Sequence, residues 1–182
     1  MIARRAFAIV LLTSLLAGCA VDASGQANDQ ADELELAVEA VPFVSRGQVF
    51  LSAGVVRLSA HVDVPTDTDY LDTVERIIAV GAESPLADRK MLGIKITGEG
   101  TLTLWNVDPE DLESVLAAAR ISWQYASDGA SLDATLVGDE LFAELHVTDE
   151  HLVASALEEL TDRVESEGLL HRPGGLEVRV SS

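Results

Sequence analysis

The sequence predicts an α+β fold, a two-layer sandwich in which a mainly antiparallel sheet carries about three helices on one face. Three observations support this class. A strand-helix pattern occurs three times, with Val64, Val107 and Val147 at equivalent positions and a period of about 40 residues. Glycine-containing turns join the strands between the helices. Apolar residues make up 48 % of the 182-residue chain, which is enough for one core. The pattern resembles a ferredoxin-like βαββαβ plan extended by a further repeat.

Each expected helix begins at an oxygen-bearing cap and carries one apolar stripe. The first turn of a helix has unpaired N–H groups and a partial positive charge, which oxygen-bearing or acidic residues satisfy. The expected caps are Thr66 with Asp69, Asp108 with Pro109 and Glu110, and Thr148 with Asp149 and Glu150. Gly168 is expected to end the third helix. The stripes, in chain order, are Leu71, Val74 and Ile78; Leu112, Val115, Leu116 and Ala119; and Val153, Leu157, Leu160 and Val164.

The strands lie between and around these helices. Two hairpins are expected, with turns at Gly98-Glu99-Gly100 and at Gly138-Asp139. The final segment, "LEVRV", alternates as a strand does, and Leu34–Ala53 should add one or two strands. Trp123 and Tyr125 follow the second helix and are expected to cover the core rather than to form a recognition pair.

Aligning the three copies on their valines assigns the strand faces. Val62, Trp105 and Leu145 should face the helices. The opposite face then carries a candidate partner surface, because a contiguous apolar patch in water usually marks a contact. Two alternatives are that residues 34–53 cover this patch, or that the second strand is buried on both sides. The candidate residues are His61, Leu102, Leu104, Phe142, Glu144 and His146.

The N-terminus has the form of a secretory signal peptide over residues 1–18. Arg4 and Arg5 precede an apolar run that is too short to span a bilayer, and the run ends in Leu16-Ala17-Gly18-Cys19. This ending resembles the lipobox of bacterial lipoproteins. The resemblance implies cleavage between Gly18 and Cys19, a diacylglycerol on the Cys19 thiol and an acyl chain on the new amine.

A lipid anchor of this kind implies an extracytoplasmic position in the bacterial cell envelope. In lipoproteins of two-membrane bacteria, Asp after the cysteine favours retention at the inner membrane. Ala20 at that position permits transfer to the outer membrane, and in a one-membrane organism the anchor implies the outer face of the cytoplasmic membrane. Two acyl chains hold a protein stably, whereas one holds it only marginally.

The composition after Cys19 divides the rest of the chain into a short polar segment and a longer, more apolar one. Ala20–Glu33 is small and polar, and we expect residues 19–33 to form the lipidated cysteine and a flexible acidic tether. Residues 34–182 should form a single α+β domain with three strand-helix repeats. Loss of Arg4 and Arg5 leaves ten basic and all 31 acidic residues, a net charge of −21. This charge opposes binding to nucleic acid and to anionic lipid, so the membrane is reached through the lipid alone.

The sequence contains no catalytic or metal-binding motif. We find no G-x-S-x-G, H-E-x-x-H or P-loop, and the acids near Asp63 and the histidines His146 and His151 are better explained by helix caps and surface positions than by metal ligation. We therefore expect no catalytic residue, no metal and no cofactor beyond the lipid. The favoured function is a non-catalytic module that binds an envelope protein or assists envelope assembly; the alternatives are a small-ligand-binding lipoprotein and an enzyme whose site has no local motif.

Overall fold

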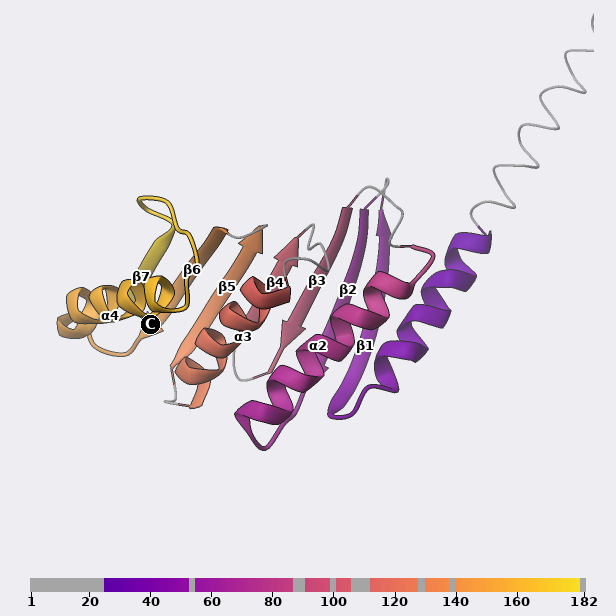
Figure 1. Ribbon diagram of the computed structural model, residues 1–182, viewed down its shortest axis with the longest axis horizontal. Coiled ribbons are helices and arrows are strands. Elements are labelled where there is room, and N and C mark those ends of the chain that lie inside the picture. The colour runs from indigo at the N-terminus through magenta and orange to yellow at the C-terminus, as the bar shows by residue number, and fades with distance from the viewer. Residues whose placement is uncertain are drawn as a thin grey trace, which may run out of the picture.

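A computed structural model describes residues 25–52, 55–86, 91–98, 101–105, 112–127, 130–137 and 140–180. They form one seven-stranded sheet with helices on one of its faces (Figure 1). After a helix over residues 25–39, the elements are β1 (Val44–Ser52), β2 (Val55–Val62), α2 (Asp67–Glu83), β3 (Met91–Thr97), β4 (Thr101–Trp105), α3 (Leu112–Ser127), β5 (Ser131–Val137), β6 (Glu140–Val147), the 3₁₀ turn η2 (Glu150–Leu152), α4 (Val153–Ser166) and β7 (Leu176–Val180).

The strands lie in the sheet in the order in which they occur in the chain. The pairs β1–β2, β3–β4 and β5–β6 are antiparallel, and the pairs bridged by α2, α3 and α4 are parallel. The predicted α+β class is therefore confirmed, but the sheet is mixed rather than mainly antiparallel. Each of these helices connects two strands that are neighbours in the sheet. In a ferredoxin-like plan, by contrast, another strand lies between the two strands that a helix connects.

Residues 25–39 form a helix beside β1, so the expectation of a flexible tether over Ala20–Glu33 is wrong from residue 25 onward. Cys19 and residues 20–24 lie outside the described residues. The segment Leu34–Ala53 contributes the end of this helix and a single strand. A tether was expected because two of the four residues that this helix buries are alanines, which give the sequence only a weak apolar period. Packing against β1 stabilises the helix. The buried residues of the helix are Ala27, Ala31, Leu34 and Val38.

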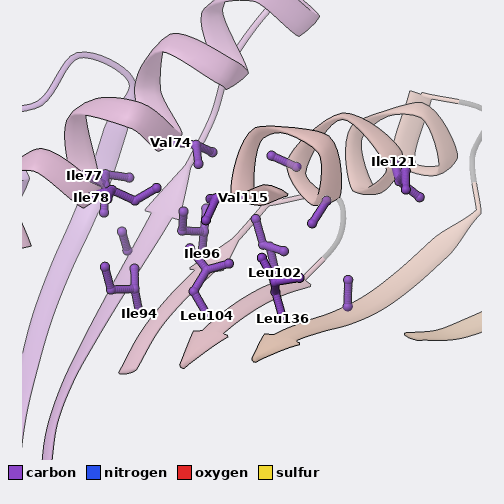
Figure 2. Packing of buried hydrophobic residues seen from close by; sticks show 14 of the residues in the cluster. Val74, Ile77, Ile78, Ile94, Ile96, Leu102, Leu104, Val115, Ile121 and Leu136 are labelled. Atoms are coloured by element: carbon purple, nitrogen blue, oxygen red, sulfur yellow. The ribbon is translucent and has the colours of Figure 1, made fainter. Parts of the chain in front are cut away.

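The core lies between the sheet and its helices (Figure 2). Each strand points alternate residues toward the helices, and in β2 to β6 these residues are almost all aliphatic and buried. The predicted stripes of α2 and α4 contribute Val74 and Ile78, and Leu160 and Val164, whereas Leu157 remains 37 % exposed. The strand residues of this layer include Val56, Leu58, Ala60, Ile94, Ile96, Leu132, Leu136, Leu141 and Leu145.

Leu102 and Leu104 belong to this core, which corrects their assignment to an uncovered face. Both have no exposed surface, and Figure 2 shows them beneath the helices. Leu104 pairs with Leu136, which pairs with Leu141, so all three share the helix-covered face. The valine alignment was out of register by one residue at β4. Val62 and Leu145 are buried as predicted, but Trp105 lies on the opposite face, where it pairs with Gly93.

The helix ends follow the expected chemistry in part. The Thr66 hydroxyl accepts a hydrogen bond from the Asp69 amide at 3.2 Å and so caps α2 as predicted. The expected cap at Asp108 lies outside the described residues. At the third helix Asp149 is the member of the expected group that caps: its carboxylate accepts from the His151 amide at 2.9 Å and starts η2, which leads into α4. Gly168 follows α4 with φ +76°, a conformation that favours glycine.

Trp123 and Tyr125 lie within α3 rather than in a loop after it. Trp123 stacks on Tyr70 of α2, with ring centroids 5.2 Å apart, and Tyr125 is buried beneath the Arg163 guanidinium at 4.8 Å. Both rings therefore pack between helices, as the core-covering interpretation expected. Within the described residues, no helix is both long enough and apolar enough to cross a membrane.

Candidate functional site on the open face of the sheet

The face of the sheet opposite the helices is left open by the described residues (Figure 1). Strand register places residues of β1 to β6, most of them polar or aromatic, in rows that cross this face. One row is Gln48, Ser59, Lys95, Thr103, Thr135 and Phe142. The next is Phe50, Arg57, Gly93, Trp105, Val137 and Glu140.

A groove of about 770 Å³ runs over β1–β4 on the open face. Phe50, 53 % exposed, stands at one side, and the Arg57 guanidinium lies 5.1 Å from the centroid of the Trp105 ring. Gly93 makes this geometry possible, because a Cβ there would lie 2.6 Å from a carbon of the Trp105 ring. The groove therefore combines two aromatic rings with a cation stacked on one of them.

The groove is a cationic area on an acidic protein. Arg57 and Lys95 are both exposed, and neither forms an ion pair within the described part of the chain. The chain as a whole carries a net charge of −19. Two unneutralised cations beside aromatic rings favour a ligand group that is negatively charged and attached to an apolar or ring-shaped surface.

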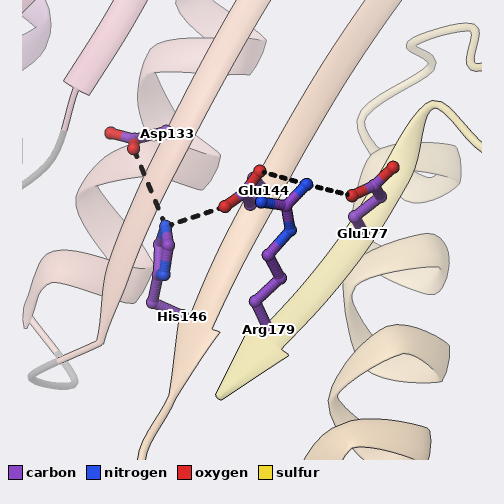
Figure 3. A network of polar contacts seen from close by, with 5 residues as sticks. All are labelled: Asp133, Glu144, His146, Glu177 and Arg179. Carbon is purple, nitrogen blue, oxygen red and sulfur yellow. Dashed lines mark hydrogen bonds and ion pairs between the residues drawn. The ribbon is translucent and has the colours of Figure 1, made fainter. Parts of the chain in front are cut away.

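The other end of the open face is acidic and internally paired (Figure 3). His146 Nε2 lies 3.3 Å from Glu144 and 3.8 Å from Asp133. Arg179 lies 3.3 Å from the same Glu144 and 2.9 Å from Glu177. The hydrogen bond that the Arg179 guanidinium donates to the Glu177 carboxylate, and the charge of Glu144, raise the pKa of Arg179 above its usual range. These groups satisfy one another, so this network has less free charge to offer than the groove.

The structure separates the residues that the sequence grouped. Phe142, Glu144 and His146 do lie on the open face, on β6. His61 also lies on this face, but on β2, where its ring contacts Thr97 at 3.1 Å; β3, β4 and β5 stand between it and Glu144. With Leu102 and Leu104 in the core, the predicted surface does not exist as one patch.

The sequence interpretation missed the residues that line the groove. Arg57 and Lys95 each lie between two apolar residues of their strand, and this alternation could have placed them on the solvent face. Gly93 opposite Trp105 was a further signal, since a glycine inside a strand often marks the close approach of another group. Finding the groove itself needed the pairing of four strands.

The groove offers binding groups rather than a reactive constellation. Its polar members are a guanidinium, an ammonium, an amide and hydroxyls: Arg57, Lys95, Gln48, Ser52, Ser59 and Thr103. Among the described residues, no three His, Cys, Asp or Glu side chains are grouped so as to hold a metal ion. A comparison of the chain with protein-family models, curated proteins and solved structures finds no match.

Proposed function

We propose that this protein is a lipid-anchored module of the bacterial cell envelope that binds a partner through the open face of its sheet and does no chemistry on it. The lipobox-like ending at Cys19 supports the anchor and the extracytoplasmic position. The observation that supports binding is the groove in which Arg57 stacks on Trp105 beside Lys95, which forms no ion pair with any residue that the structure describes.

The chemistry of the groove defines the partner that it would suit. An envelope protein that presents an acidic side chain beside an aromatic or aliphatic one would pair its carboxylate with Arg57 or Lys95 and its apolar group with Phe50 and Trp105. Aromatic and arginine anchors commonly carry most of the energy of such an interface. The protein partner is our first choice, because the groove is an open part of a broad sheet face rather than an enclosed cavity.

A small acidic ligand is the second candidate. The groove volume of about 770 Å³ falls within the range of small-molecule sites. A photo-crosslinking residue in place of Thr103, with the same substitution at the exposed helix residue Glu75 as control, separates the two. A protein adduct at position 103 alone supports the partner, whereas a small-mass adduct on the purified protein supports the ligand.

Charge reversal tests the groove directly. Arg57→Glu and Lys95→Glu should each reduce the position-103 adduct by about tenfold, since a lost charge-assisted contact costs roughly 1.5–3 kcal/mol. Arg76→Glu makes the same charge change on the exposed surface of α2 and is the matched control. Equal yields from all three variants would contradict the binding role of the groove.

The anchor has its own test. Cys19→Ala should abolish acyl labelling and leave an uncleaved precursor or a product in the soluble fraction. Unchanged labelling and membrane fractionation of this variant would overturn the lipoprotein assignment without affecting the proposal for the groove.

A further inference from the structure

The outer edge of β7 is the part of the sheet that no described residue covers. The Ala143 amide of β6 donates to the Gly175 carbonyl at 2.9 Å. This hydrogen bond shows which main-chain groups of β7 point toward β6. Because main-chain groups alternate along a strand, the N–H and C=O groups of Leu176, Val178 and Val180 point away from β6. The strand thus presents a row of main-chain donors and acceptors to whatever lies beyond it.

An exposed apolar side chain of α4 lies on the flank beside this edge. Arg163 of α4 donates to Gln124 of α3 at 3.0 Å, so the Arg163 side of the helix faces α3. Leu157 lies about 120° around the helix from Arg163, on the side toward the free edge, and is 37 % exposed. Val180 on β7 is 44 % exposed. An extra strand beside β7 would cover both side chains.

The sequence of β7 is complementary to itself in the antiparallel direction. If two copies of "LEVRV" pair around Val178, Glu177 of each copy lies opposite Arg179 of the other. Leu176 then lies opposite Val180, and Val178 opposite its own equivalent. The charged pairs fall on the open face and the apolar pairs on the helix face, as the existing sheet requires.

The main-chain geometry selects the same register. Leu176, Val178 and Val180 are the residues with outward N–H and C=O groups, so each of the three pairs can exchange two hydrogen bonds. Glu177 and Arg179 then occupy the closer pairs between them, where opposite charges stabilise and like charges destabilise the pairing. Arg179 could keep its contact with Glu144 while it pairs with Glu177 of the second copy.

We infer that two copies of this protein associate edge to edge through β7, in an antiparallel pairing centred on Val178 that joins their sheets. The occupant is a second copy because the charge pattern matches itself and because the register set by those charges agrees with the register set by the backbone. The association uses the edge of the sheet, so it leaves the groove of both copies free.

A single cysteine tests this pairing in the full-length, membrane-anchored protein. Across a two-fold hydrogen-bonded pair the Cα atoms lie about 5.5 Å apart, within the range of a disulfide. Val178→Cys should therefore give a disulfide-linked homodimer under mild oxidation. The unsubstituted chain, whose single cysteine is Cys19, and Glu75→Cys on the exposed surface of α2 are the controls.

Charge variants in the Val178→Cys background make the test specific. Arg179→Glu and Glu177→Arg each place like charges opposite one another, and each should lower the homodimer yield roughly tenfold. Co-expression of these two variants should restore a mixed dimer, because one β7 is then acidic and the other basic. Circular dichroism of each variant checks that the fold is intact.

The outcomes are distinct. Homodimers that depend on the two charges and are rescued by mixing support the inference. A homodimer yield no higher than that of Glu75→Cys, a yield that is insensitive to both charge reversals, or a disulfide product with a different protein would overturn it. None of these results depends on the position-103 adduct, so this inference and the proposed function can fail separately.

Discussion

At β1 the outward amides of Gly47 and Val49 donate to the carboxylates of Glu39 and Glu35, at 3.3 and 3.2 Å. At β7 the outward main-chain groups meet no described residue. The helix over residues 25–39 makes the difference, since it packs beside β1 and brings one carboxylate per turn to the strand (Figure 1). A helix precedes β1 in the chain, whereas no helix follows β7 within the described residues, so the first edge of the sheet is covered and the last one is open. This asymmetry separates a closed edge from one that can pair.

The largest expected effect comes from detaching the helix that closes the β1 edge. Val38→Asp places a carboxylate at a fully buried position and should lower the free energy of unfolding by about 3–5 kcal/mol. Leu36→Asp makes the same chemical change on the same helix at a position that is 68 % exposed, and should cost less than about 0.5 kcal/mol. Urea unfolding measures both. Similar losses would show that the helix does not depend on its contact with the sheet.

The pH dependence of stability through Tyr70, which lies in α2 in the middle of the helix layer, serves as a reference that is independent of both edges of the sheet. Burial raises the pKa of Tyr70 to about 12, an effect partly opposed by its hydrogen bond with Ser122. The unfolded phenol ionises near pH 10, so ionisation is easier in the unfolded state. Stability is therefore intact below pH 10 and falls as the pH rises from 10 toward 12, by roughly 2–3 kcal/mol at most.

Tyr70→Phe should remove this part of the alkaline loss. Unfolding of both proteins at pH 8, 10 and 11 isolates the contribution of Tyr70, since every other group is common to the two. A wild-type stability that falls in parallel with that of the variant would contradict the assignment. The edge variants described above should leave the difference unchanged.

The smallest effect is expected from the two carboxylates themselves. Glu35→Ala with Glu39→Ala removes two long, partly exposed hydrogen bonds and should cost about 1–2 kcal/mol. Hydrogen exchange gives the sharper measurement: the Gly47 and Val49 amides should be protected in the wild type and lose protection in the double variant. Equal protection in the two proteins would mean that the helix body, rather than its carboxylates, closes the edge.

Hydrogen exchange in the wild-type protein gives the comparison between the edges its clearest test. In a dilute, monomeric sample of wild-type protein, the outward amides of Val178 and Val180 should exchange faster than those of Gly47 and Val49. At high concentration, the inferred pairing should slow exchange at β7 without changing β1. Protection at β7 that is independent of protein concentration would argue for a covering segment within the same chain.

Local sequence signals were sufficient for much of the fold. The cap at Thr66, the stop at Gly168 and the buried stripe through Leu160 and Val164 depend on neighbouring residues along one helix, and all three hold in the structure. The α+β class likewise follows from alternating strand and helix periods. Such features are fixed within a few residues of chain, where backbone hydrogen bonding and side-chain spacing decide the outcome.

Tertiary contacts decided the features that the sequence interpretation missed. Residues 27 and 31 are alanines, so the first helix shows its apolar stripe only when β1 lies against it. The facing of Leu104 and Trp105 depends on strand register, and a one-residue shift exchanges the two faces of the sheet. The groove requires side chains from β1, β2, β3 and β4 in adjacent rows. The sequence by itself determined most of the helices and strands, with the helix over residues 25–39 as the exception. Pairing between distant strands decided which side chains meet, because that choice depends on contacts between residues far apart in the chain.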